Sequence, residues 1–231
     1  MKTDNHVLYG SFEDDYVTIT NGDGVYVYDD QGNQYLDAVG GVCVVNIGHG
    51  VEEIGEVIKQ QLDKVTYTYG GIVDNEPRQK LAQKLQEWAP PSMGYTKSLF
   101  CSGGAEANEG ALKLAYQYHC ERGNPTKRKV IGRWQSYHGN TIATLSMSGR
   151  TAWRAPVSPL LLDFPHIPPP YCYRCPWDLE YPGCGMTCAE ELEKVISQEG
   201  SENISAFIAE PVIGTSMSAV VPPDEYYGIV R

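Results

Sequence analysis

Three polar segments of this 231-residue chain carry residue types that could do chemistry, and each follows an apolar run. They are Ser102-Gly103-Gly104-Ala105, Tyr137-His138-Gly139 and Glu210. The first segment precedes a run with helical spacing, so it predicts a strand, a glycine turn and the start of a helix. Free N–H groups at a helix start attract anions, phosphate above all. A turn that only needs positive φ contains the same glycines, so the spacing leaves phosphate binding and a plain turn open.

Four of the seven cysteines have the spacing of metal ligands. They are Cys172, Cys175, Cys184 and Cys188, in the pattern C-x2-C-x8-C-x3-C. Thiolates in two close pairs suit tetrahedral zinc or an iron–sulfur centre. The linking loop is shorter than in the usual zinc ribbon, and the N-terminal stretch MKTDNHVLYG contains no apolar signal segment. Reduced thiols are therefore the favoured interpretation, a bound metal is the alternative, and a disulfide comes last.

Composition and motifs argue against several classes of protein. The net charge of −11 argues against binding to nucleic acid or to anionic membrane surfaces. The longest apolar stretch, near Val39 to Ile47, is shorter than the ~20 residues that span a membrane. The glycine turn matches neither GxGxxG nor GxxxxGK[ST], so it predicts neither a dinucleotide fold nor a P-loop NTPase. With 42% hydrophobic and 20% charged residues, the chain fits an acidic cytoplasmic enzyme.

The first part of the sequence predicts a β-meander followed by two helices. Residues 17–37 contain the short β-branched and aromatic runs VTIT and VYVY, separated by the turn Asn21-Gly22-Asp23-Gly24. The small-residue segment 38–50 is typical of a pocket wall or, more commonly, of tight backbone packing. Apolar residues then recur at helical spacing within 51–64 and 76–88.

The rest of the sequence alternates strands and helices. Strands are predicted at 129–134 and 204–209, a helix at 189–199, and the start of another helix at 222–231. Residues 156–188, rich in proline and cysteine, are interpreted as an excursion from the main fold. Alternation implies parallel βαβ units and an α/β fold. Ligands gather beyond the carboxyl ends of parallel strands, so we expect the three polar segments to meet at one edge of the sheet.

Five sequence motifs resemble those of the class III aminotransferases, which are pyridoxal-phosphate enzymes of fold type I. The motifs are GVYVYDDQGNQYLDAVGG, NIGHG, FCSGGAEANEGALKLAY, SYHGNT and AEPVIG, in the family's order and over nearly the whole chain. The resemblance implies a three-layer α/β fold with a mostly parallel sheet, plus an N-terminal β-meander that belongs to a smaller domain. It assigns residues 1–50 to the smaller domain and 51–231 to the N-terminal portion of the large, cofactor-binding domain, including the excursion at 156–188.

The resemblance also implies roles for individual residues. The implied cofactor-binding residues are Gly103, Gly104, Ala105, Tyr137, His138 and Gly139, the implied catalytic residue is Glu210, and Cys43 would line the substrate pocket. Many members have a hydroxyl residue at the Gly103 or Ala105 position. In this chain the cofactor phosphate would instead rest on backbone N–H groups and the helix dipole. Tyr137 would stack on the pyridine ring; without the resemblance, a core tyrosine and a solvated carboxylate would explain Tyr137 and Glu210.

The implied reaction is amino transfer from an amine or amino acid to a 2-oxo acid, carried out by a homodimer. In the family, the Schiff-base lysine and the aspartate that pairs with the pyridine nitrogen come from the second half. The present sequence ends before both, so we expect an inactive, poorly soluble N-terminal fragment or a truncated gene model. The alternatives are another pyridoxal-phosphate reaction, such as decarboxylation, racemisation or amino migration, and a non-catalytic ligand- or metal-binding fragment.

Overall fold

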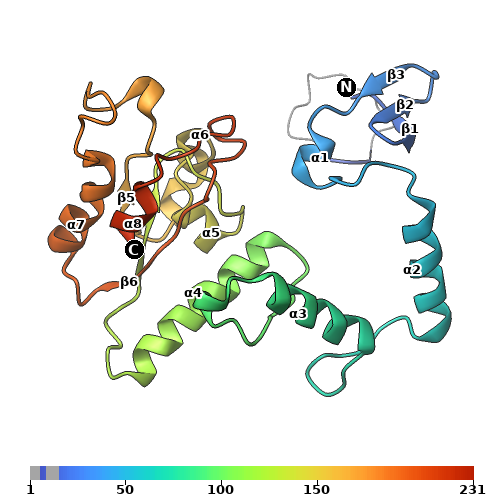
Figure 1. The fold of residues 1–231 in the computed structure, drawn as a ribbon, viewed down its shortest axis with the longest axis horizontal. Coiled ribbons are helices and arrows are strands. Elements are labelled where there is room, and N and C mark those ends of the chain that lie inside the picture. Colours follow the sequence, from blue (N-terminus) through green and yellow to red (C-terminus); the bar gives the residue numbers. More distant parts are fainter. Residues whose placement is uncertain (1–5, 9–15) are drawn as a thin grey trace. The chain divides into compact units, whose positions relative to one another are not determined.

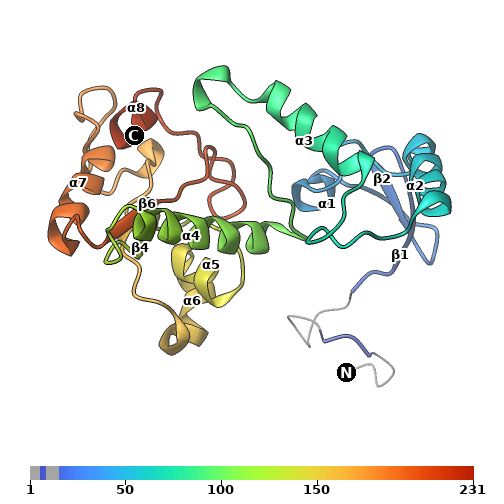
Figure 2. The same ribbon diagram turned by 90° about the horizontal axis from the view of Figure 1, so that it is seen from below.

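The computed structural model describes residues 6–8 and 16–231. The chain divides into two compact units between Tyr95 and Thr96 (Figures 1 and 2). The domain boundary expected after residue 50 falls within the first unit and stays a prediction. Over the described ranges, no helix combines the length and the apolar composition that a membrane crossing requires.

The first unit contains the antiparallel meander that residues 17–37 predict. β1 (Ile19–Asp23), β2 (Tyr26–Asp29) and β3 (Gln34–Leu36) pair in that order. The first turn is tighter than expected, because Asp23 still pairs with Tyr26 and the chain reverses at Gly24, which has a φ of 56°. Asp29 closes the second turn, since its carboxylate accepts two backbone N–H groups of that turn at 2.8 and 2.9 Å.

The small-residue segment after the meander forms a left-handed turn. α1 (Gly40–Cys43) has φ values of 53°, 57°, 61° and 65° along its four residues. Glycine adopts this region freely, but a β-branched residue such as Val42 is strained there. Asp37 holds the turn, because its carboxylate accepts the N–H of Gly41 at 2.9 Å and lies 3.0 Å from Nε2 of His49.

The substitution Val42→Gly is expected to raise the free energy of unfolding by about 1 kcal/mol, because relief of left-handed strain outweighs the greater freedom of glycine in the unfolded chain. The Val42 side chain is 63% exposed, so little packing is lost. Val44 provides the control, since it is 79% exposed and has a right-handed φ of −104°. Val44→Gly should therefore lower the free energy of unfolding by about 0.5–1 kcal/mol. Urea unfolding curves measure both variants, and shifts of the same sign would contradict the strain.

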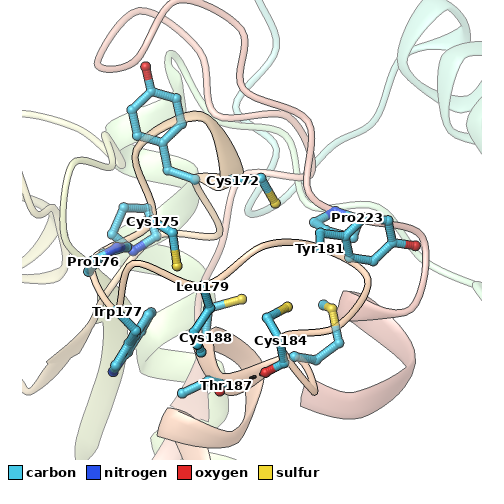
Figure 3. Close-up of a pocket in the computed structure, with 13 residues that line it drawn as sticks. Cys172, Cys175, Pro176, Trp177, Leu179, Tyr181, Cys184, Thr187, Cys188 and Pro223 are labelled. Carbon is cyan, nitrogen blue, oxygen red and sulfur yellow. Dashed lines mark hydrogen bonds between the residues drawn. The ribbon is translucent and has the colours of Figure 1, made fainter.

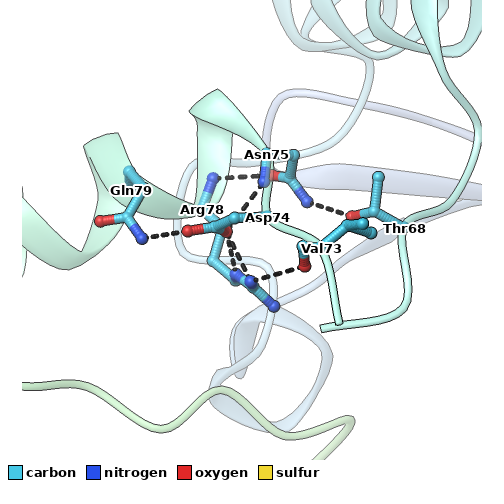
Figure 4. A network of polar contacts seen from close by, with 6 residues as sticks. All are labelled: Thr68, Val73, Asp74, Asn75, Arg78 and Gln79. Atoms are coloured by element: carbon cyan, nitrogen blue, oxygen red, sulfur yellow. Dashed lines mark hydrogen bonds and ion pairs between the residues drawn. The ribbon is translucent and has the colours of Figure 1, made fainter. Parts of the chain in front are cut away.

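Two amphipathic helices follow and confirm the predicted spacing. They are α2 (Glu52–Lys64) and α3 (Glu76–Trp88). Asn75 caps α3, because its side-chain oxygen accepts the N–H of Arg78 at 3.0 Å. The carboxylate of Asp74 accepts hydrogen bonds from the side chains of Arg78 and Gln79, which fastens the preceding loop to the helix (Figure 4). The apolar stripes of both helices are exposed.

The second unit contains a parallel sheet and its covering helices. Its strands are β4 (Lys129–Arg133), β5 (His166–Ile167) and β6 (Ile204–Phe207). Its helices are α4 (Gly104–Glu121), α5 (Ile142–Met147), α6 (Thr151–Arg154), α7 (Thr187–Glu199) and α8 (Tyr226–Val230). Short 3-10 helices lie at Ala155–Leu160 and Cys172–Arg174, and at Pro91–Met93 in the first unit.

The strand order β5-β4-β6 confirms the expected α/β class. Both pairings are parallel. Crossovers between parallel strands are right-handed. The connection from β4 leads to its neighbour on one side, β5, and the connection from β5 leads back past β4 to the neighbour on the other side, β6. The two connections therefore place α5 and α6 on one face and α7 on the other, which makes three layers (Figures 1 and 2). The buried core between the sheet and α7 consists of Ile131, Ile167, Leu192 and Ile204.

One expected strand is absent. The apolar run Leu99-Phe100-Cys101 is predicted as a strand before the glycine turn, but it adopts no strand conformation and pairs with no strand of the described chain. A strand needs a neighbour to bond its backbone groups, and an apolar run alone does not supply one. The segment 156–188, expected as an excursion, contains β5, which pairs with β4 at one edge of the sheet.

Candidate functional site

The glycine turn forms the start of α4 and leaves it open. Gly103 is the N-cap residue, and no side chain caps the helix. A Cβ atom placed on Gly103 or Gly104 would meet no other atom within 4 Å. Glu106 reaches back toward the helix start, where the N–H and O–H of Ser102, the residue before the N-cap, donate to its Oε2 at 2.8 and 2.5 Å. These hydrogen bonds lower the pKa of Glu106. Its carboxylate offsets part of the positive dipole end, while the N-cap Gly103 itself makes no side-chain cap.

The loop 136–141 lies directly against the start of α4. Gly139 has a φ of 134°, and a Cβ atom on it would lie 2.8 Å from Cβ of Ala105. The Asn108 side chain donates to the carbonyl oxygen of His138 at 2.7 Å. Glu109 accepts the hydroxyl hydrogen of Thr141 at 2.6 Å. Two predicted segments, distant in sequence, are thus in contact as expected.

Tyr137 presents an exposed ring beside this contact. Its side chain is 39% exposed, and its ring meets that of Trp153 edge to face, with 5.1 Å between centroids. The Tyr137 N–H donates to Oε1 of Glu210 at 2.9 Å. The ring is therefore held from the side by Trp153 and through its backbone by the third predicted segment.

Glu210 has a defined set of partners. Its Oε1 accepts the N–H of Tyr137, and its Oε2 accepts the N–H of Gly214 at 2.9 Å. Its carbonyl oxygen accepts hydrogen bonds from Arg133 and from the Tyr227 hydroxyl. Both carboxylate oxygens are bound to backbone amides, so a freely solvated carboxylate does not describe this residue.

His138 is a buried, neutral imidazole. The residue is 7% exposed, and its backbone N–H donates to Oγ of Ser148 at 2.8 Å. Burial, aided by the positive charge of Arg133, lowers the pKa of His138 to about 4. Its Nε2 is buried and has no hydrogen-bond partner within the described chain. The ring therefore adds no positive charge next to the glycine turn at neutral pH.

Several residues that build this site escaped the sequence patterns. They are Asn108, Thr141, Arg133 and Tyr227. One signal was available: Arg133 is a charged residue within the apolar strand KVIGRW, and a buried charge requires partners. The other contacts join helices and loops whose proximity no local pattern encodes.

Cys43 is exposed and lies in the left-handed turn α1 of the first unit. Its role in lining a substrate pocket stays a prediction.

The four clustered cysteines line one small cavity between the 3-10 helix Cys172–Arg174 and the start of α7 (Figure 3). All are free thiols. In the part of the chain that the structure describes, no three His, Cys, Asp or Glu side chains form a group that could hold a metal ion. Burial, followed by the neighbouring Cys172 and Cys184, raises the pKa of Cys188 to about 11. Burial in the cavity therefore favours the neutral thiol of Cys188.

The raised pKa predicts slow alkylation of Cys188. Only the thiolate reacts, so its rate with iodoacetamide should rise about tenfold per pH unit from pH 7 to 10. Cys101, which is exposed, serves as the internal reference. Mass spectrometry of quenched, digested samples measures both cysteines in one experiment. Labelling of Cys188 as fast as Cys101 at pH 7 would contradict the burial of a neutral thiol.

Known proteins are similar to this sequence over most of its length. The family model described as aminotransferase class-III matches residues 9–231. The chain is 36% identical to the putrescine–pyruvate aminotransferase of Pseudomonas aeruginosa, over 92% of this chain and 46% of that protein. It is 32% identical to the adenosylmethionine-8-amino-7-oxononanoate aminotransferase of Geobacter sulfurreducens, over 95% of this chain and 48% of that protein.

Solved structures share the fold as well. An (S)-enantioselective omega-transaminase from Thermomicrobium roseum superimposes with a TM-score of 0.85 at 38% identity, over 93% of this chain and 47% of that chain. The chain spans about half the length of the curated relatives it matches.

Proposed function

The chain belongs to the class III aminotransferases, and from this premise we propose the activity of the full-length protein. It transfers an amino group from an amine or amino acid to a 2-oxo acid, with pyridoxal phosphate as cofactor. One observation carries the proposal: three segments expected at strand ends meet in one place. Gly139 approaches Ala105, and the Glu210 carboxylate binds the N–H of Tyr137.

The residues present fit the cofactor. The uncapped start of α4, with open space above Gly103 and Gly104, suits a phosphate held by backbone N–H groups. The partly exposed ring of Tyr137 suits one face of a flat heterocycle. When bound, pyridoxal phosphate supplies the conjugated ring that accepts electrons from the bond broken at the amino-bearing carbon.

Each residue then has a separate task. The N–H groups of Gly103 to Ala105 bind the phosphate and, with the helix dipole, balance its charge. Tyr137 orients the ring and excludes water from one face. His138 keeps its neutral form beside them, since its pKa is about 4. Glu210 holds Tyr137 in place through that residue's N–H.

We further propose that the Schiff-base lysine and the pyridine-pairing aspartate lie in a part of the full-length protein outside this sequence. The matched relatives are about twice as long as the matched region, which supports this. The full-length protein would act as a cytoplasmic homodimer, and the 231-residue chain alone would be inactive and poorly soluble. Mixing this chain with pyridoxal phosphate tests whether the chain alone lacks the Schiff-base lysine and is inactive. A stable, borohydride-sensitive absorbance band would contradict both statements.

Product analysis of the full-length protein tests the proposed reaction. Purified protein is incubated with pyridoxal phosphate, pyruvate and a panel of amines and amino acids, and alanine formation is measured. Tyr137→Ala should lower kcat/KM about tenfold through loss of ring stacking, whereas Tyr118→Ala, exposed on α4, should not. Carbon dioxide release, inversion of the amino acid or movement of its amino group would assign the protein to one of the alternative reactions. Absence of any product would favour the non-catalytic alternative.

For the cysteine cluster we propose reduced thiols that pack the proline-rich segment, with zinc or an iron–sulfur centre as the alternative. The raised pKa values of Cys172 and Cys188 support the neutral thiol form. Elemental analysis of the purified full-length protein distinguishes the two. Zinc or iron at about one atom per cluster would overturn the thiol proposal.

A further inference from the structure

Arg133, the last residue of β4, is a buried charge without an acidic partner among the described residues. It is 0% exposed. Its Nη2 donates to the carbonyl oxygen of Glu210, and its Nη1 donates to the Tyr227 hydroxyl oxygen at 3.4 Å. Burying a guanidinium is costly unless hydrogen bonds compensate for lost water. A neutral, apolar residue would complete the strand at lower cost, so the contacts of Arg133 call for a role beyond packing.

Tyr227, on α8, acts on the same carbonyl group. Its hydroxyl donates to the Glu210 carbonyl oxygen at 2.7 Å and lies 3.1 Å from the carbonyl oxygen of Pro211. Two donors from two different elements therefore converge on one backbone oxygen just beyond β6. This oxygen belongs to the residue whose side chain reaches the Tyr137 loop.

The side chain of Glu210 is fixed as firmly as its backbone. Its two carboxylate oxygens accept the N–H groups of Tyr137 and Gly214, each at 2.9 Å. Hydrogen bonds to a charged acceptor are about twice as strong as neutral ones. Movement of the Glu210 backbone would therefore pull directly on the N–H of Tyr137.

We propose that Arg133 and Tyr227 are positioning residues that clamp the Glu210 backbone, and that this clamp sets the position of Tyr137 through the Glu210 carboxylate. The inference rests on the proposed function, which gives the Tyr137 ring the task of holding the cofactor. The clamp links the ends of β4 and β6 with α8. Through the Glu210 carboxylate, the positions of β4, β6 and α8 thus determine the position of the Tyr137 ring, although Tyr137 lies in none of these elements.

Amide hydrogen exchange of the full-length protein, measured by mass spectrometry without added cofactor, tests the clamp. Tyr227→Phe removes one hydroxyl and should speed exchange in the peptide containing Tyr137 about fivefold. Arg133→Lys removes the forked donor and should speed it about tenfold. Tyr118→Phe removes the same atom from an exposed ring on α4 and should change nothing.

A local role is separated from a general loss of stability by two further measurements. Exchange in the core peptide containing Leu192, on α7, should remain at its original rate. In addition, Tyr227→Phe combined with Glu210→Gln should exchange no faster at Tyr137 than Glu210→Gln alone, because both act through one carboxylate. Unchanged exchange at Tyr137, equal acceleration at Leu192, or additive effects would each overturn the clamp.

A separate readout keeps the clamp distinct from the proposed function. Equilibrium dialysis with pyridoxal phosphate should show about fivefold weaker binding for Tyr227→Phe than for the original protein. If local exchange accelerates but binding stays the same, the clamp stands and the cofactor role of Tyr137 falls. If binding weakens without a change in exchange, the clamp falls.

Discussion

Gly139→Ala is expected to lower the free energy of unfolding by about 3 kcal/mol, the upper end of the usual cost of overpacking. The new methyl group would lie 2.6 Å from Oγ1 of Thr144 and 2.8 Å from Cβ of Ala105. Residue 139 also has a φ of 134°, which residues with a side chain rarely adopt. Relief requires the loop to move away from the start of α4. In the full-length protein we therefore also expect weaker pyridoxal phosphate binding, because the Tyr137 ring and the phosphate turn separate.

Gly183→Ala is the matched control for this variant. Gly183 lies in the same unit, and a Cβ atom on it would meet only the carbonyl oxygen of Glu180, at an ordinary 3.5 Å. Its free energy of unfolding should change by less than about 0.5 kcal/mol. Urea unfolding measures stability, and equilibrium dialysis measures cofactor affinity. Equal behaviour of the two variants would show that Gly139 is not needed for the close approach.

Acidification from pH 6.5 to pH 4 should destabilise the fold by up to about 3 kcal/mol for each of two buried histidines. Burial lowers the pKa of both His138 and His166 to about 4, and the charges of Arg133 and Arg154 add to the effect. An unfolded histidine binds a proton near pH 6.5. Between these values the unfolded state therefore holds more protons, so the free energy of unfolding falls as the pH falls. Above pH 6.5 the two histidines contribute their full stabilisation.

The histidine contribution is measured from urea unfolding at several pH values between 4 and 7. His138→Gln and His166→Gln should each flatten the pH dependence by about half, after allowance for the carboxylates that titrate in the same range. His6→Gln, at an exposed position, should leave the slope as it is. If neither buried variant changes the slope, the two imidazoles are already charged in the folded state.

Elements with strong local signals could be predicted from the sequence. The helices α2 and α3 begin within one residue of their expected positions, because apolar spacing and the Asn75 cap are local features. The strand expected at 99–101 did not form, because a strand exists only with a paired neighbour. The left-handed α1 could be suspected from Gly40-Gly41 but not from Val42 and Cys43, which disfavour that conformation.

Individual residues of the candidate site could be predicted from the sequence, but the contacts that join them could not. Strand-end position and family resemblance singled out Tyr137 and Glu210, and the structure brings them within one hydrogen bond. The clamp from Arg133 and Tyr227 could not be predicted, since its members come from β4 and α8, which are far apart in the sequence. Only the presence of a charge in an apolar strand indicated that Arg133 had partners.

The strand order of the second unit also has a consequence for how the protein folds during synthesis. β4 is the first of the three strands to leave the ribosome, yet it lies in the centre of the sheet. In its pairing with β6, Lys129 lies opposite Ile204, so one edge of β4 can pair only after this distant strand has been synthesised. Contacts of such long sequence separation form slowly, because a large loop must close first. The edge of β4 that pairs with β6 therefore stays without its partner strand until residues 204–207 have been synthesised.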